Sequence, residues 1–316
     1  ATVDPVIGKF DMIGRNPETQ AQLVNMSKFL LSDNKTCGFT SGDRSILGIG
    51  SLAQDRTFMD TIKTYPINVE VVTLRTYNIT SGKLPAAATG SVTVKLNTSM
   101  VMLPKEPMQP RLADERVGFF QNPITEFSDE QQVTTRGSII QRYRLEPKDP
   151  ERYRRGQLSE PKNPIIYYID PATPKKWIPY LKAGVEDWNT AFEAAGFKNA
   201  IIAKEWPNDP NMSLDDARYS VIRYLPSETE NAYGPRIVDP RSGEIMESHI
   251  CWYHNVMNLL KKWYMVQCGP LDKRARTMTF DDKLMGSLIQ FVSSHEVGHS
   301  IGLRHNMAAS SATPVE

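Results

Sequence analysis

The sequence predicts an α+β protein in which a β-rich N-terminal domain precedes a domain of mixed strands and helices. Short stretches of alternating apolar residues dominate residues 1–140, whereas long helical periodicities appear only after residue 164. Between these regions, residues 141–163 mix arginines and lysines with acidic residues and prolines, which is typical of a solvated linker rather than of an RNA-binding run. We therefore expect a β-rich domain at 1–140, a linker at 141–163 and a second domain at 164–316.

The composition is that of a globular protein without a bulk charge. The 316 residues include 37 Lys and Arg against 36 Asp and Glu, and 40% of the residues are hydrophobic. This balance argues against nucleic acid and lipid as partners. No apolar run approaches the roughly 20 residues that a transmembrane helix needs, so we expect no transmembrane segment. There is no signal peptide, but a chain that opens at Ala1 says nothing about the full-length product.

In the N-terminal domain, apolar alternation predicts strands, proline- and glycine-containing stretches predict turns, and one helix is expected. The strands are expected around 67–71, 92–96, 117–120 and 138–143, the turns or loops at Ser81–Pro85 and Met102–Pro107, and the helix at Pro17–Leu31. None of these residues carries recognisable chemistry. A scaffold or substrate-presenting role is therefore our interpretation of this domain.

The second domain should alternate strands with helices. Strands are expected at 165–169, 200–203 and 219–225, a helix from Pro179 to its stop at Gly196, a hairpin of 232–238 and 244–252 around a turn at 239–243, and a connecting helix at 255–267. Thr279 and Asp282 form a T-x-x-D capping pattern for a further helix. Its inward stripe is expected to run through Leu284, Leu288, Val292 (or Phe291), His295 and His299.

The end of that helix carries the one motif with clear chemistry. His295 and His299 are four residues apart and share one helix face, so both can bind the same metal ion. Glu296 can reach a water on that metal without being a ligand. Gly302 can adopt the left-handed conformation that stops a helix, after which the chain turns back and offers His305 as a third ligand. Three ligands and one open position are typical of catalytic zinc. The alternative is a surface helix whose histidines align by chance, which we disfavour because the stripe continues the core face.

The complete pattern H-E-x-x-H-x-x-G-x-x-H resembles the metzincin metallopeptidases. More narrowly, the chain resembles secreted bacterial zinc-dependent metalloproteases in which a β-rich domain precedes a metzincin-like domain. This resemblance implies that 164–316 form the upper subdomain of such a peptidase, a twisted mixed sheet with a backing helix and the active-site helix. It also implies an extracytoplasmic location. Metzincins carry a methionine-containing turn after the third histidine, and Met307 is too close to His305 to form it. We therefore expect a fragment truncated before that turn.

The resemblance implies a zinc-dependent endopeptidase acting on peptides or proteins. Zn²⁺ would lower the pKa of its bound water from about 16 to about 7, and Glu296 would act as the general base. An extended substrate would pair with the edge strand at 232–238. The candidate substrate-binding residues are Tyr233, Gly234, Arg236 and Ile237. An ordinary solvent-facing edge is the alternative for this strand.

Two other readings of the whole chain are open. A non-catalytic extracellular binding or complex-forming protein could retain a zinc site, although it would have no need for Glu296. A folded but poorly active fragment is the other.

The remaining histidines and cysteines are expected to be structural. We interpret His249 and His254 as packing or surface residues. Cys251 and Cys268 could form a disulfide in an exported protein. Cys37 is expected to be a small buried thiol rather than a thiolate that caps the zinc.

Overall fold

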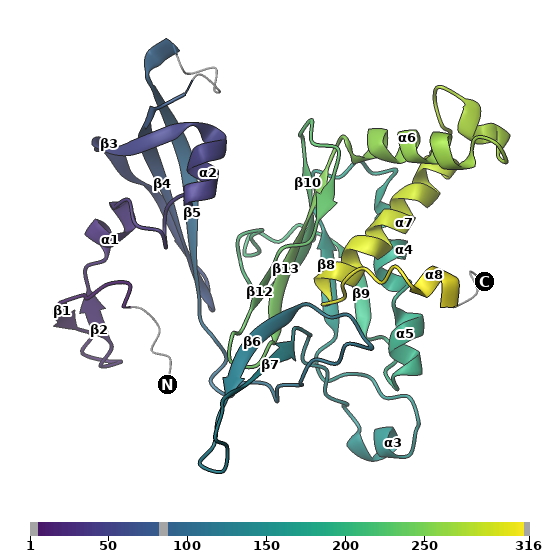
Figure 1. Cartoon of the computed structure of the whole chain (residues 1–316), viewed down its shortest axis with the longest axis horizontal. Helices are drawn as coiled ribbons and strands as arrows, with labels where there is room; N and C mark the ends of the chain where they lie inside the picture. Colours follow the sequence, from purple (N-terminus) through teal and green to yellow (C-terminus); the bar gives the residue numbers. More distant parts are fainter. Residues whose placement is uncertain (1–5, 82–87, 313–316) are drawn as a thin grey trace. The chain divides into compact units, whose positions relative to one another are not determined.

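The computed structural model describes residues 6–81 and 88–312 and divides the chain into two compact units, residues 1–102 and 103–316. The chain is α+β with a β-rich N-terminal region (Figure 1). The predicted turn at Ser81–Pro85 lies outside the described residues except for Ser81. Among the described residues, no helix combines the length and the apolar character needed to cross a membrane.

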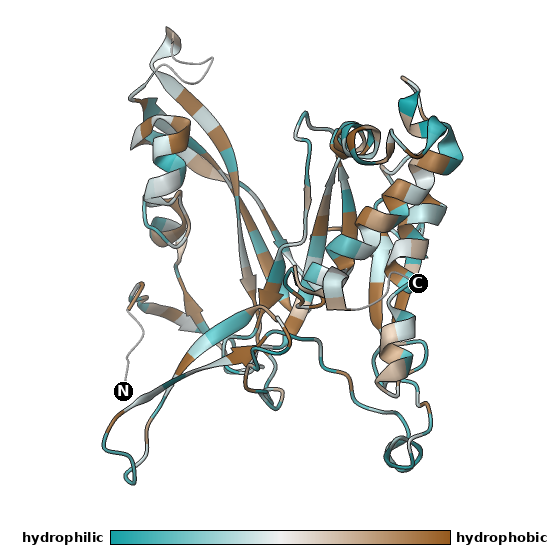
Figure 2. Cartoon of the chain, turned by 45° about the vertical axis from the view of Figure 1, so that its right-hand side comes forward, coloured by the Kyte–Doolittle hydropathy of each residue, from teal (hydrophilic) through white to brown (hydrophobic). Residues whose placement is uncertain are grey.

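The first unit contains a three-stranded antiparallel sheet in the order β3-β4-β5. Its elements are β1 (Met12–Arg15), β2 (Gln22–Val24), α1 (Ser27–Leu31), α2 (Ser41–Leu47), β3 (Ile49–Thr64), β4 (Asn68–Ile79) and β5 (Ser91–Val101). The strands predicted at 67–71 and 92–96 are confirmed as parts of β4 and β5. Hydrophobic and hydrophilic residues alternate along these strands (Figure 2), as expected for a sheet with two unlike faces.

The helix predicted at Pro17–Leu31 is wrong for most of its length. The Asn16 side chain accepts hydrogen bonds from the backbone N–H groups of Glu18 and Thr19, which closes a turn between β1 and β2. Such a bond offers the backbone an alternative to the helix. Only the last five residues of the predicted range form α1.

The core of the first unit holds both apolar and polar side chains. Cys37 is buried against Leu30 and Val71 as a free thiol, which agrees with its expected packing role. Arg75 is completely buried and donates hydrogen bonds to the carbonyl oxygens of Leu30 (2.5 Å) and Ser32 (3.2 Å). Burying this cation is tolerable because its N–H groups are partnered.

The second unit is built around one mixed sheet with the strand order β9-β8-β10-β13-β11. Its elements are β6 (Gln121–Glu126), β7 (Thr135–Ile140), α3 (Pro150–Arg154), β8 (Ile165–Ile169), α4 (Ile178–Glu186), α5 (Asn189–Ala194), β9 (Ile201–Glu205), β10 (Ser220–Leu225), β11 (Ala232–Tyr233), β12 (Arg236–Val238), β13 (Ile245–Tyr253), α6 (Val256–Cys268), the 3₁₀ helix η2 (Lys273–Arg276), α7 (Asp282–Ser300) and α8 (Ala309–Ala312). The four strands from β9 to β13 are parallel, whereas β11 and β12 both pair antiparallel with β13. The strands predicted at 165–169, 200–203 and 219–225, the hairpin and the connecting helix are confirmed.

Two helices, α4 and α7, pack against each other closely enough to require a glycine (Figure 1). A Cβ atom at Gly184 of α4 would lie 2.5 Å from the carbonyl oxygen of Gln290 and 2.6 Å from Cβ of Ser293. The Ser293 hydroxyl donates to the carbonyl oxygen of Leu181 at 2.9 Å, which fixes α7 along α4. This contact sets where the end of α7 lies relative to the sheet.

The single helix predicted from Pro179 to Gly196 is instead two helices, α4 and α5, separated at Asp187 and Trp188. The Trp188 indole N–H donates to the carbonyl oxygen of Ser294 at 2.8 Å, and the ring lies where a side chain on Gly298 would otherwise be. Packing against α7 therefore overrides the continuous helical periodicity. Gly196 has a φ of +92° and follows the end of α5, in line with its expected role as a stop.

The segment from 103 to 163 packs within the second unit, which differs from the predicted boundaries at 140 and 163. The backbone N–H of Arg142 donates to Gly243 O (2.9 Å), and Arg144 forms a two-pronged ion pair with Glu244. One of the charges that suggested a solvated linker, on Arg144, thus has its partner on the β12–β13 hairpin. The strand predicted at 117–120 is wrong, since it forms only an isolated bridge between Phe119 and Leu303.

Two local predictions near α6 and α7 are also corrected. The N-cap of α7 is Asp281, whose side chain accepts from the backbone N–H of Leu284 at 2.8 Å, rather than Thr279. Cys251 and Cys268 are both free, because the thirteen-residue helix α6 lies between them and ends at Cys268.

Candidate metal centre

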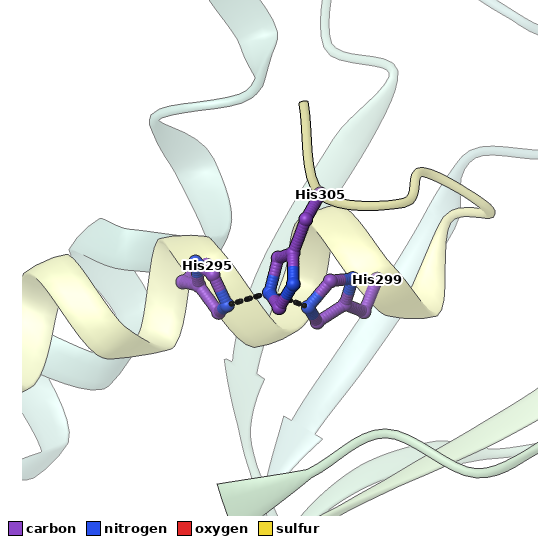
Figure 3. Close-up of side chains that lie close together, drawn as sticks. All are labelled: His295, His299 and His305. Carbon is purple, nitrogen blue, oxygen red and sulfur yellow. Dashed lines mark hydrogen bonds between the residues drawn. The ribbon is translucent and has the colours of Figure 1, made fainter. Parts of the chain in front are cut away.

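Three histidine side chains converge at the C-terminal end of α7. His295 and His299 project from consecutive turns of the helix, and His305 reaches back from the loop that follows it (Figure 3). The Nε2 atom of His305 lies 3.0 Å from Nε2 of His299 and 3.1 Å from Nε2 of His295. The ligand atoms of all three lie within 4.8 Å of one another.

Three ring nitrogens this close together can bind one metal ion. Tetrahedral zinc with nitrogen ligands at about 2.0–2.1 Å places those nitrogens roughly 3.4 Å apart. The Nδ1 atom of His299 lies 2.8 Å from the carbonyl oxygen of Leu303, which can only accept, so Nδ1 carries the proton. A neutral His299 therefore presents an unprotonated Nε2 to the centre of the cluster. The residues present fit a zinc ion.

The turn that returns His305 is held by a segment far away in the sequence. Gly302 has a φ of +114°. Its carbonyl oxygen accepts from Phe120 N (2.7 Å), and Arg304 N donates to Gly118 O (2.8 Å). A side chain at Gly302 would meet Gln141 O at 2.2 Å, so the turn requires glycine for space as well as for conformation.

Glu296 lies beside the three histidines. The residue is only 7% exposed and lines the same cavity as the three histidines. Among the described residues, its carboxyl group has no hydrogen-bond or ion-pair partner. Burial raises its pKa to about 7. Burial and the nearby His299 and His305 also lower the pKa of His295, which favours the neutral form that binds metal.

The three histidines line a cavity of about 1060 Å³. One side is the edge formed by β11 and β12, where Tyr233, Gly234 and Arg236 line the wall. Gly234 lies directly against α7, since a Cβ there would be 3.4 Å from Glu296 O. Ile237, the fourth residue of the predicted edge, does not line the cavity but pairs with Glu247 of β13.

Sequence reasoning missed the other walls of the cavity. One wall is apolar and comes from α6 and α7, and another comes from the segment before the predicted second domain. These lining residues are Val256, Leu259, Leu260, Trp263, Phe291 and Val292 from the helices, and Phe120 and Gln141 from the earlier segment. Helical spacing on α6 was a usable signal for the apolar wall. Nothing in the sequence marks Phe120 or Gln141.

Two histidines predicted to be structural lie apart from the cluster. His249 Nε2 is 3.0 Å from an oxygen of Glu247, and His254 Nδ1 is 2.7 Å from the Tyr224 hydroxyl. Neither belongs to the candidate metal group found in the described part of the chain.

Comparison with family models gives two matches. Residues 1–148 match a family described as a domain of unknown function, DUF5117, and residues 277–316 match a family described as Met-zincin, DUF4953. The second match covers α7 and all three histidines. Searches of curated proteins and of solved structures found no match.

Proposed function

We propose that the chain is the zinc-binding part of a metzincin-like endopeptidase that hydrolyses peptide bonds. The observation that carries this proposal is the convergence of three imidazole Nε2 atoms beside a buried, unpartnered Glu296. The Met-zincin match over residues 277–316 supports it. The mixed sheet, four parallel strands with an antiparallel edge at β11, supports the upper subdomain that the metzincin resemblance implies. A location outside the cytoplasm is part of the proposal and rests on resemblance.

His295, His299 and His305 would hold the metal. A zinc ion bound there would supply a Lewis acid that polarises the scissile carbonyl and acidifies a water molecule. Glu296 accepts a proton from the attacking water as the new C–O bond forms, and it returns that proton to the amine nitrogen as the C–N bond breaks. A burial-raised pKa suits a group that must take and return a proton near neutral pH. A zinc ion bound by the histidines would counteract part of this increase in the pKa of Glu296.

The edge formed by β11 and β12 is the proposed binding strand for an extended substrate. Ala232 and Tyr233 pair with β13 on one side only, because β11 ends the sheet. The exposed backbone of such a strand can accept another chain through main-chain hydrogen bonds. Tyr233, Gly234, Arg236 and Ile237 are the proposed contact residues.

Cleavage of an unfolded protein tests this proposal. The zinc-loaded protein should cut it, cleavage should stop when a chelator removes the zinc, and added zinc should restore it. Metal analysis should give one zinc per chain. One tightly bound zinc with no cleavage would favour the alternative, a binding protein that keeps a zinc site.

A further inference from the structure

The cavity beside the histidines contains one cation without an acidic partner. Arg236 is the only Lys or Arg among the described residues that line this cavity. Its Nε donates to Gln141 Oε1 at 2.7 Å, and its Nη1 lies 3.4 Å from the carbonyl oxygen of His299. Its guanidinium carbon is 3.8 Å from the centre of the Phe120 ring. All three contacts are with neutral groups.

Glu296 lines the same cavity but forms no ion pair with Arg236, and two carboxylates on the β12–β13 hairpin are engaged elsewhere. Asp239 pairs with Arg241 and Glu244 with Arg144, whereas Oε1 of Glu247 only lies near Nε2 of His249, at 3.0 Å. No ion pair involves Arg236 among the described residues. Burial lowers the pKa of Arg236, because it disfavours the charged form. A half-buried cation of this kind gains most from an incoming anion.

The position of Arg236 relates it to the bond that is cut. Its guanidinium stacks on Phe120, and the Phe120 ring centre is 6.0 Å from that of His299. An extended peptide advances about 3.3 Å per residue, so a group bound by Arg236 lies within roughly three residues of the scissile bond.

We propose that Arg236 recognises a carboxylate of the peptide substrate, held in place by Gln141 and Phe120. This inference rests on the proposed peptidase function and names its substrate class as peptides with a carboxylate near the cleavage site. The carboxylate comes either from an Asp or Glu side chain or from a free C-terminus. Both offer the same planar, two-oxygen acceptor to the guanidinium fork.

Matched peptides separate the two sources. One series carries Glu or Gln at the first, second or third position from the cut, and another ends in a free acid or an amide at those distances. The zinc-loaded protein should cleave the carboxylate member of at least one pair about tenfold better in kcat/KM, the size expected for a charge-assisted contact. Which series shows the preference identifies the source.

Variants test whether Arg236 is responsible. Arg236→Gln should abolish the preference, and Arg236→Lys should retain part of it because it keeps the charge. Arg136→Gln is the control: it removes the same charge from an exposed residue of β7 outside the cavity and should keep the full preference. Equal zinc content and unfolding temperature would show that the variants are folded.

A binding measurement keeps this inference separate from catalysis. In the zinc-loaded Glu296→Gln background, calorimetry should give tighter binding of the carboxylate peptide, and Arg236→Gln should remove the difference. Equal affinity for acid and amide peptides in both series, or a preference that survives Arg236→Gln, would refute the role of Arg236. If the zinc-loaded wild type cleaved none of the peptides while this binding difference was present, the result would count against the peptidase function and not against the role of Arg236.

Discussion

Glu296 is buried, lies close to three histidines, and has a carboxyl group without a hydrogen-bond or ion-pair partner among the described residues. Because no other described residue binds its carboxyl group, replacing it should disturb the chemistry more than the fold. Glu296→Gln keeps the shape but cannot accept a proton. We expect the variant to bind zinc as the wild type does and to lose at least about 100-fold in kcat, the lower end of general-base contributions. Zinc analysis and peptide hydrolysis measure both; near-wild-type turnover would remove Glu296 from the role of base.

The raised pKa of Glu296 also predicts how the metal-free protein responds to pH. The folded state holds the proton up to about pH 7, whereas the ordinary value is 4.5. Its favourable contribution is therefore fully present below pH 4.5 and is lost as the pH rises through 7. We expect Glu296→Gln to stabilise the metal-free protein relative to wild type above pH 7, by up to about 3 kcal/mol.

Denaturant unfolding with a chelator present, at pH 5 and pH 8, measures this difference. The gap between variant and wild type should be larger at pH 8. A gap that is the same at both pH values would mean that the carboxyl group titrates normally.

At the scale of elements, the turn after α7 depends on the segment 118–120 and on Gln141. Gly302→Ala places a Cβ against Gln141 O and imposes a side chain at a φ of +114°. A shift of the turn would remove this clash at the lowest energetic cost, and it would also move His305. We expect zinc affinity to fall by about 10- to 100-fold, as for loss of a group that orients a ligand.

Competition with a coloured chelator measures that affinity. Gly137→Ala on β7 is a fair control, because its Cβ would make only ordinary contacts with Ile124 at 3.5 Å and beyond. His305→Ala sets the scale for complete loss of the third ligand. Wild-type affinity in Gly302→Ala would show that the turn tolerates the side chain.

Elements with local signals could be predicted from the sequence, and those decided by distant contacts could not. The strand Ile165–Ile169 is a compact apolar run, and the histidine spacing in α7 is a property of one helix. The Asn16 turn, in contrast, wins over a plausible helix through two hydrogen bonds. The break at Trp188 arises from α7, more than a hundred residues later. Phe120 lies at the cavity through a hydrogen bond to the turn at Gly302, and Gln141 lies beside it because its backbone N–H donates to Phe120 O.

At the scale of the whole molecule, the two units have separate cores and only one holds the histidines. Zinc should therefore raise the unfolding temperature of the second unit and leave that of the first unchanged. At a free zinc concentration 1000 times the Kd, linkage gives about 4 kcal/mol, or roughly 8–16 °C for a unit of this size.

Calorimetry with zinc and with a chelator checks this. Assignment of the transitions comes from Trp fluorescence, since all five tryptophans lie between 177 and 263, in the second unit. An equal shift of both transitions would mean that the units unfold together.

The hydrogen bond between Phe120 and Gly302 limits how the two matched segments can be exchanged by recombination. The DUF5117 match ends at residue 148 and thus includes Phe120 and Gln141, whereas the Met-zincin match begins at 277. Exchanging the first 148 residues would remove the segment 118–120, which is hydrogen-bonded to the turn before His305, together with the two side chains that contact Arg236. Recombination at that point would leave a defective metal centre unless the new N-terminal segment held the turn before His305 in the same way. We therefore expect the two matched segments to be inherited together.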